Sequence, residues 1–449
     1  MHRLRSALTF LVLALGLGAG AARAEWLQPD PSIKQAQMDL RYALRDTVGH
    51  PNDPALLDSV AVLMLRLARL DEAAKLFDRV ATLEPNDATA RAARGKLALF
   101  ADQPARAESL LTGLEALDPL AAADLFAARL RLGEYAAAAD LAPLVNQDGR
   151  REMLGKLAER APYEITAGPE RAVVPFARSY PIVLVRVKLN GQAVLMAVDT
   201  GASDLLIDDM AFRRLKLQPV SGQGVAFWSG TRGVVKYAIA QRLEIGGFRI
   251  ENCPAGVKNL GRWSLEVNPQ SERIAGVIGL NLLRRFSPTL DYAQSRLELR
   301  RPGTAWTPGP GAVRVPFQLW GENELTVFGS IAQGRRCAMV VQTGVPACGI
   351  GAPEDVFDEM GVKPGTLARI AKGAGQFLQG RPWAAVVVPT VMVGGVARDR
   401  LAGWSGALDS SELWRHGVRR DALLSHDFFK DRRVTFDWDR RELVFEGGK

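Results

Sequence analysis

An internal repeat constrains the fold of this 449-residue chain more than any other feature. Three pairs of segments match: residues 174–176 with 315–317, residues 196–201 with 339–344, and residues 276–297 with 422–443, the last pair without a gap. A repeat of this length indicates two tandem copies of one structural unit. The matched segments are short, apolar and separated by turn residues, which predicts that each unit is rich in β-strands.

The first copy contains a motif that carries chemistry. Apolar residues 194–198 run directly into Asp-Thr-Gly-Ala-Ser at residues 199–203. Such a sequence predicts a carboxylate, Asp199, at a tight turn after a buried strand. Gly201 leaves room for a substrate backbone and water, and the hydroxyls of Thr200 and Ser203 can orient the acid through hydrogen bonds. Asp199 is therefore the candidate catalytic residue.

A second segment of the same copy strengthens this interpretation. Residues 277–283 read Val-Ile-Gly-Leu-Asn-Leu-Leu. Together with the Asp-Thr-Gly-Ala-Ser motif, this segment resembles the retroviral-type (retropepsin-like) aspartic proteases. The resemblance implies that the segment around Gly279 packs beside the catalytic loop. It also implies peptide-bond hydrolysis by water that an aspartate activates, on a peptide or protein substrate, with no cofactor.

The second copy departs from that pattern at its centre. Aspartic proteases use two carboxylates that share one proton, but Gln342 stands where the second would fall. An amide forms hydrogen bonds but cannot move the proton in acid–base catalysis. Pro346 and Ser425 replace Ser203 and Gly279. Thr343 and Gly344 are retained, and the resemblance implies that the threonines hold the two loops together, so we interpret the second copy as a scaffold without its acid.

Two functions follow from these observations, and the sequence leaves both open. The first is an aspartic endopeptidase that works with Asp199, and the second is an inactive pseudoprotease that binds an extended peptide by strand pairing. Pairing of two chains would bring two copies of Asp199 together. A short tether, however, gives the second copy an effective concentration on the order of millimolar, so a pseudo-dimeric monomer is expected rather than a homodimer.

Residues 224–234 fall where the resembled family carries its flap, the hairpin that closes over substrate. They place glycines between apolar arms, which is typical of a mobile hairpin. Trp228 and Gly230 are therefore candidate flap residues. The alternative for Trp228 is a core tryptophan at the base of a hairpin.

Residues 25–150 are expected to be helical. Two sets of residues match at a constant shift of 34: Ala73, Phe77, Val80 and Pro85 with Ala107, Leu111, Leu114 and Pro119, and residues 51–53 with 85–87. This period resembles tetratricopeptide (TPR) repeats, in which small residues let paired helices approach; Pro85 and Pro119 would end the second helix of each pair. The alternative is a plain helical bundle. A repeat array would recruit substrate or bind a protein partner on its concave face.

The domain plan completes the expected fold class, a multi-domain α plus β protein. Residues 1–24 read as a signal peptide, with a basic start, an apolar run and an Ala-Arg-Ala cleavage site. The helical TPR-like repeat precedes two tandem β-rich acid-protease lobes that form a pseudo-two-fold pair. The first lobe spans residues 164–301, a linker rich in Pro and Gly spans 302–311, and the second lobe spans 312–449. A periplasmic or secreted location is expected, with no transmembrane segment in the mature chain.

Composition excludes several other functions. The net charge of +8 is spread as arginine pairs rather than gathered into a basic helix, which argues against nucleic-acid binding. His50, His416 and His426 have no Cys or acidic residue at ligand spacing, so no metal site is expected. Cys337 and Cys348 flank the Gln342 loop; they are either a disulfide or buried apolar fillers.

Overall fold

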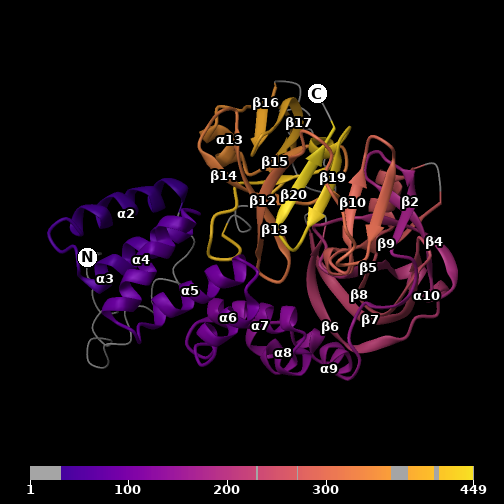
Figure 1. The fold of residues 1–449 in the computed structure, drawn as a ribbon, viewed down its shortest axis with the longest axis horizontal. Coiled ribbons are helices and arrows are strands. Elements are labelled where there is room, and N and C mark those ends of the chain that lie inside the picture. Colours follow the sequence, from indigo (N-terminus) through magenta and orange to yellow (C-terminus); the bar gives the residue numbers. More distant parts are fainter. Residues whose placement is uncertain (1–31, 229–230, 270–271, 366–382, 409–413, 448–449) are drawn as a thin grey trace, which may run out of the picture.

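The computed structural model describes residues 32–228, 231–269, 272–365, 383–408 and 414–447. A helical region at the N-terminal end is followed by a large β-rich region (Figure 1). The helices run in order: α2 (Ile33–Asp46), α3 (Pro54–Arg66), α4 (Leu70–Leu83), α5 (Ala88–Phe100), α6 (Pro104–Leu111), α7 (Pro119–Leu132), α8 (Tyr135–Leu141), the 3-10 turns η1 (Ala142–Val145) and η2 (Asp148–Arg150), and α9 (Arg151–Glu159).

Aspartates at the 34-residue spacing start several of these helices. Asp53, Asp87 and, three residues short of that period, Asp118 are the N-caps of α3, α5 and α7, and each side chain accepts a hydrogen bond from a backbone N–H of the first turn. Such caps satisfy amide groups that have no partner inside the helix. Pro119 is the first residue of α7. It therefore begins a helix, where its fixed φ fits, instead of ending one as expected.

Small residues let consecutive helices approach. Ala73 and Ala107 are fully buried on α4 and α6, as are Phe77 and Leu111. A side chain at Gly95 of α5 would lie 2.6 Å from Leu111 Cγ. The helical region continues through α9 to Glu159, beyond the expected boundary at residue 150, because Met153, Leu154 and Leu157 give α9 a buried apolar face.

The first β unit, residues 164–301, contains the following strands and short helices: β1 (Glu164–Ala167), β2 (Arg171–Arg178), β3 (Leu184–Leu189), β4 (Gln192–Val198), β5 (Leu205–Asp208), α10 (Asp209–Arg214), β6 (Pro219–Trp228), β7 (Thr231–Ile245), β8 (Phe248–Lys258), α11 (Gly261–Val267), β9 (Ile274–Ile278), α12 (Leu280–Leu283), β10 (Ser287–Asp291) and β11 (Arg296–Arg300). Strand β4 runs parallel to β9, and β5 runs parallel to β8 and antiparallel to β9. Strand β3 pairs with both β4 and β7.

The second β unit, residues 312–447, contains β12 (Val313–Trp320), β13 (Glu324–Ile331), β14 (Arg336–Val341), β15 (Ile350–Ala352), α13 (Glu354–Glu359), β16 (Ala384–Val393), β17 (Val396–Ser405), β18 (Ala422–Leu424), α15 (His426–Phe429), β19 (Arg433–Asp437) and β20 (Glu442–Glu446). The pairing pattern of the first unit recurs here. Strand β14 runs parallel to β18, β15 runs parallel to β17 and antiparallel to β18, and β13 pairs with β14 and β16.

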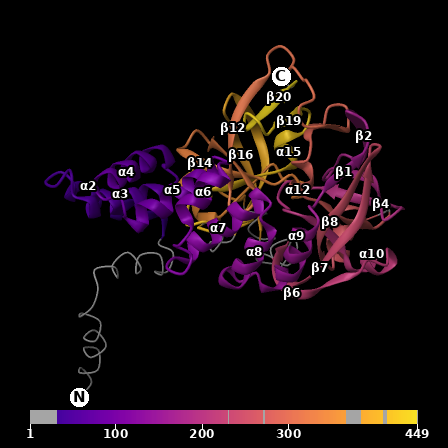
Figure 2. The ribbon, with the colours of Figure 1, turned by 60° about the horizontal axis from the view of Figure 1, so that its bottom comes forward.

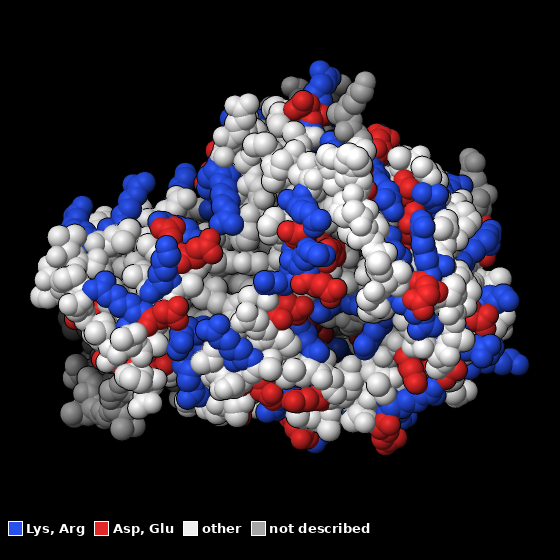
Figure 3. All heavy atoms as spheres, in the orientation of Figure 1, with Lys and Arg blue, Asp and Glu red and all other residues white. Residues whose placement is uncertain are grey.

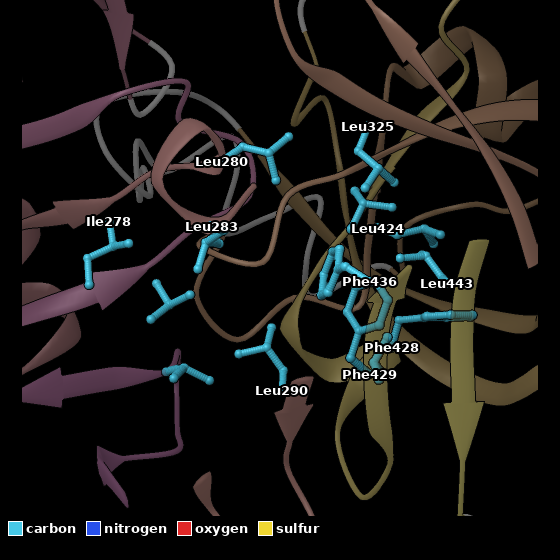
Figure 4. Packing of buried hydrophobic residues seen from close by; sticks show 14 of the residues in the cluster. Ile278, Leu280, Leu283, Leu290, Leu325, Leu424, Phe428, Phe429, Phe436 and Leu443 are labelled. Atoms are coloured by element: carbon cyan, nitrogen blue, oxygen red, sulfur yellow. The ribbon is translucent and has the colours of Figure 1, made fainter. Parts of the chain in front are cut away.

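Strands from both units join in one antiparallel sheet, in the order β2, β11, β10, β19, β20, β12. Its central pair places Thr289 opposite Thr435, and their buried hydroxyls lie 2.7 Å apart. Apolar residues 146 positions apart in the sequence pack into the same core, as Figure 4 shows for Ile278 and Leu283 of the first unit and Leu424 and Phe429 of the second. Burial of this shared core fixes how the two units sit against each other.

The helical region packs against both units. Val220, Val235 and Tyr237 at the base of the β6–β7 hairpin belong to one apolar cluster with α5–α9, and Figures 1 and 2 place α8 and α9 beside this hairpin. In the second unit, Trp320 at the end of β12 stacks on Phe100 of α5 at 4.8 Å.

One arginine of the helical region is bound to a turn of the second unit. The buried guanidinium of Arg131 on α7 donates hydrogen bonds to the backbone carbonyls of Leu319, Gly321 and Glu322 at 2.6–2.9 Å. These carbonyls lie at the turn between β12 and β13. Part of the surface of the helical region is therefore covered by the chain itself.

Cys253, Cys337 and Cys348 are free and buried, so Cys337 and Cys348 act as apolar fillers and form no disulfide.

Within the described ranges, no helix combines the length and apolarity needed to cross a bilayer. On the face shown in Figure 3, basic and acidic side chains lie interspersed.

Candidate active site

Asp199 lies at the end of β4, where the strand leaves its parallel partner β9. The Asp199 N–H donates to the carbonyl of Ile278, the last residue of β9, at 3.1 Å. Strand β4 is buried from Val194 to Val198, because apolar side chains cover both of its faces. The chain therefore presents the carboxylate at the edge of a rigid core.

The second unit builds the same connection around Gln342. Gln342 follows β14, which is parallel to β18, and its N–H donates to the carbonyl of Leu424 at 2.8 Å. Asp199 and Gln342 thus occupy corresponding positions in the two units, and both line one cavity.

Two threonines join the two loops by reciprocal hydrogen bonds. The Thr200 N–H donates to Thr343 Oγ1 at 3.1 Å, and the Thr343 N–H donates to Thr200 Oγ1 at 3.2 Å. Each hydroxyl donates in turn to a carbonyl of the opposite strand, Thr200 to Val341 at 2.7 Å and Thr343 to Val198 at 3.2 Å. Both threonines are buried. The two N–H groups and the two hydroxyls therefore all have hydrogen-bond acceptors, so the network holds the loops in one relative position.

The Asp199 carboxylate is held by both loops. Its Oδ1 atom accepts the N–H of Gly201 at 2.8 Å and the N–H of Gly344 at 2.9 Å. A side chain at Gly344 would lie 2.3 Å from Asp199 Cγ. Only glycine allows the second loop to approach the acid this closely, which explains why Gly344 is present although its loop has no aspartate.

Burial changes the acidity of Asp199, which is only 8% exposed. Loss of hydration raises the pKa of the carboxyl above its ordinary value, and the hydrogen bonds from Gly201 and Gly344 oppose this rise. In the resembled proteases a second carboxylate also raises one pKa of the pair. Here desolvation alone has that effect.

The cavity at Asp199 has a volume of about 360 Å³. Its apolar lining comes from both units, with Leu206, Trp263 and Tyr237 from the first and Trp383 and Leu423 from the second. The half-buried Gln342 lies over Gly201, since a side chain at position 201 would be 2.8 Å from Gln342 Cγ. The cavity thus combines the Asp199 carboxyl and the Gln342 amide with apolar walls, and its rim also carries charged side chains, among them Asp204, Glu322 and Lys258.

Gly279 and Ser425 support the two loops in different ways. A side chain at Gly279 would come within 2.3–2.7 Å of the carbonyl oxygens of Ala202, Ser203 and Asp204. The Ser425 hydroxyl instead donates to the Val345 carbonyl at 2.9 Å and accepts the Val345 N–H at 3.1 Å. The serine thus fixes its loop with a side chain where the glycine allows close packing.

Other predicted site residues have varied outcomes. Ser203 is exposed in the cavity wall, and its hydroxyl forms no hydrogen bond to Asp199 within the described chain; its carbonyl accepts from the Asn281 N–H at 2.8 Å. Trp228 is the last residue of β6, and its backbone pairs with Thr231 across the hairpin. Gly230 lies outside the described residues. The predicted flap is thus a hairpin whose base borders the cavity at Val235 and Tyr237.

Sequence reasoning missed a polar cluster at the cavity. Asp204 Oδ1 accepts hydrogen bonds from the Tyr163 hydroxyl at 2.9 Å and from Asn281 Nδ2 at 2.7 Å. Arg150 of η2 donates to Glu322 at 2.7 Å and lies 3.9 Å from Asp204. These residues share no motif and are brought together only by the tertiary fold.

No metal centre is found among the described residues, where no group of three His, Cys, Asp or Glu side chains converges. His416 lies 3.5 Å from Glu324, and His426 is in contact with the rings of Tyr180 and Tyr292. Among the described residues, His416 thus contacts an acidic side chain and His426 contacts aromatic rings, and neither belongs to a group of three metal-binding side chains.

Comparison with known proteins supports an aspartic protease-like unit. Residues 185–282 match the family described as aspartyl protease, and this match contains Asp199 and Gly279. No curated protein matches the chain. Among solved structures, the crystal structure of basic 7S globulin from soybean is similar at 11% identity, covering 62% of this chain and 95% of that chain, with a TM-score of 0.36.

Proposed function

We propose that the protein is an aspartic endopeptidase that hydrolyses peptide bonds with Asp199. The hydrogen bonds from Gly201 and Gly344 to one oxygen of Asp199 carry the proposal, because loops of both β units converge on that carboxyl. The aspartyl protease match to residues 185–282 supports the same class of activity. In this proposal the two units form a pseudo-two-fold pair, with Gln342 at the second acid position.

The chemistry can proceed with one acid. The Asp199 carboxylate takes a proton from water while the oxygen of that water bonds to the carbonyl carbon of the substrate. Gln342 can donate a hydrogen bond to the oxygen that becomes negative. Protonated Asp199 then returns the proton to the leaving nitrogen as the carbon–nitrogen bond breaks. The raised pKa favours the first step, since it makes the carboxylate a stronger base toward water.

The N-terminal parts of the chain belong to the same proposal. The Asp caps at or near a 34-residue period support TPR-like repeats in the helical region. An apolar run and a small-residue cleavage site within residues 1–24 favour export to a periplasm or beyond. Binding of a partner protein to the repeats stays a prediction.

A second candidate function is favoured by Gln342. Removing one member of a catalytic set commonly costs several orders of magnitude in rate. The cavity would then hold an extended peptide without cutting it, by contacts with its apolar walls and with the β6–β7 hairpin. The amide of Gln342 suits this function, because it offers both a donor and an acceptor to a peptide backbone.

The test compares the mature protein with Asp199→Asn on unfolded protein substrates at mildly acidic pH. Cleavage by the native sequence should be lost in this variant, whereas Asp39→Asn on α2, far from the cavity, should cleave normally. Serine-protease inhibitors and chelators should have no effect. Equal cleavage by Asp199→Asn would refute the mechanism, and peptide binding without cleavage would favour the second candidate.

A further inference from the structure

The helical region contributes part of the wall of the catalytic cavity. Gln147, Arg150 and Met153, from η2 and the residues beside it, line the same cavity as Asp199 and Gln342. The sequence predicted that this region recruits substrate or a protein partner. Its position at the cavity means that it contacts whatever is bound beside the acid.

This wall is fixed to the base of the β6–β7 hairpin. The backbones meet so closely that a side chain at Gly149 would lie 2.1 Å from the Gln223 carbonyl oxygen, and one at Gly222 would lie 2.6 Å from the Gly149 oxygen. Met153 is 1% exposed and packs in the apolar cluster that includes Val220. A wall packed this tightly can select among substrates by shape and charge, because it cannot move aside at low cost.

The charge of the wall is already neutralised. Arg150, whose side chain is 10% exposed, donates to Glu322 at 2.7 Å and also lies 3.9 Å from Asp204. Its guanidinium lies 5.5 Å from the centre of the Phe126 ring. An acidic substrate side chain placed against this wall would have to displace Glu322 from Arg150, and a basic one would face the buried guanidinium, so either would be costly.

We propose that Gln147, Arg150 and Met153 form a specificity-determining wall that accepts an uncharged substrate side chain, with Glu322 preventing Arg150 from pairing with an acidic one. The inference rests on the proposed function, in that it assigns a substrate preference to the same cavity. It extends that function, because the helical region becomes part of the substrate site.

The test uses Asp199→Asn as a background, so that peptide binding is measured without cleavage. A library of short peptides that vary one position at a time between uncharged, acidic and basic residues is bound to this protein and to its Glu322→Gln derivative. Loss of the Glu322 charge frees Arg150. The affinity for peptides with an acidic residue should therefore rise about tenfold at one or two adjacent positions, which is a smaller change than the loss of affinity when one partner of a buried charge pair is removed. Glu442→Gln is the matched control, since Glu442 also pairs with an arginine, Arg314, at 2.7 Å but does not line the cavity.

Met153→Leu, which nearly conserves volume, provides a second variant that should fold. It should change the preferred uncharged residue at the same positions as Glu322→Gln, whereas exposed Glu152→Gln should change none. The same profile for all variants, changes at unrelated positions, or no peptide binding at all would overturn the inference. Shifted binding together with no cleavage by the native sequence would support the wall while refuting the endopeptidase, so the two failures are distinguishable.

Discussion

At the scale of single residues, the site depends on how a lone carboxyl is kept in a buried loop. Asp199 has no second carboxylate opposite it, yet burial raises its pKa and two backbone N–H groups fix its orientation. The sequence predicted the identity of this residue and the absence of its partner. It could not predict that Gly344 of the second loop donates to Asp199, because that contact depends on the docking of the two units.

The raised pKa predicts a pH-dependent stability difference between the native protein and Asp199→Asn. A carboxyl whose pKa rises on folding contributes stability that is present below its unfolded pKa, about 3.9, and is lost as pH rises through its folded pKa. Asparagine stays neutral throughout. The variant should therefore gain stability relative to the native protein between about pH 4 and neutral pH, measured by urea unfolding at several pH values. A native protein that gains relative stability over this range would contradict the direction of the shift.

At the scale of elements, the two loops are matched in backbone contacts but differ in their tolerance of side chains. The internal repeat predicted which strands would correspond, because apolar patterns and turns are local properties of the sequence. It could not predict the contacts of Arg131 or Arg150 with the second unit, since they join residues 191 and 172 positions apart and follow no periodic pattern.

The loop glycines provide a prediction with an internal control. Gly344→Ala would place a methyl group 2.3 Å from Asp199 Cγ, and the backbone hydrogen bond from residue 344 holds that carboxyl in place. We expect a loss of about 1–3 kcal/mol of unfolding free energy, typical of overpacking, and loss of cleavage. Gly201→Ala meets only the Gln342 side chain, which can turn away, so its stability loss should be smaller. Chemical denaturation of both variants measures this, and an equal or reversed order would contradict the description of the loops.

At the scale of the whole molecule, the helical and β-rich regions share their cores. One apolar cluster joins α5–α9 to the β6–β7 hairpin, and another joins α2–α5 to Trp320, Ala338 and Val418 of the second β unit. The sequence suggested a boundary between independent domains near residue 150. Apolar residues at the surface of each region, which the helical period alone cannot assign to a partner, instead connect them.

This continuity predicts one cooperative unfolding transition for the mature protein. Separate unfolding of the helices would expose the apolar side chains of both clusters to water, which is unfavourable. Calorimetry should give a single peak whose calorimetric and van't Hoff enthalpies agree. Two separated peaks, or a helical fragment that stays folded after limited proteolysis, would show that the regions are independent.

The central claim is that the two units assemble one catalytic cavity in which Gln342 occupies the place of a second acid. Cleavage of unfolded protein by Gln342→Asp, with its oligomeric state measured in parallel, tests this claim directly. A second carboxyl facing Asp199 could share its proton and restore a catalytic pair, so we predict that cleavage increases by orders of magnitude in a monomer. An active wild-type dimer whose rate is unchanged by Gln342→Asp would contradict the claim, since the acids would then be two copies of Asp199.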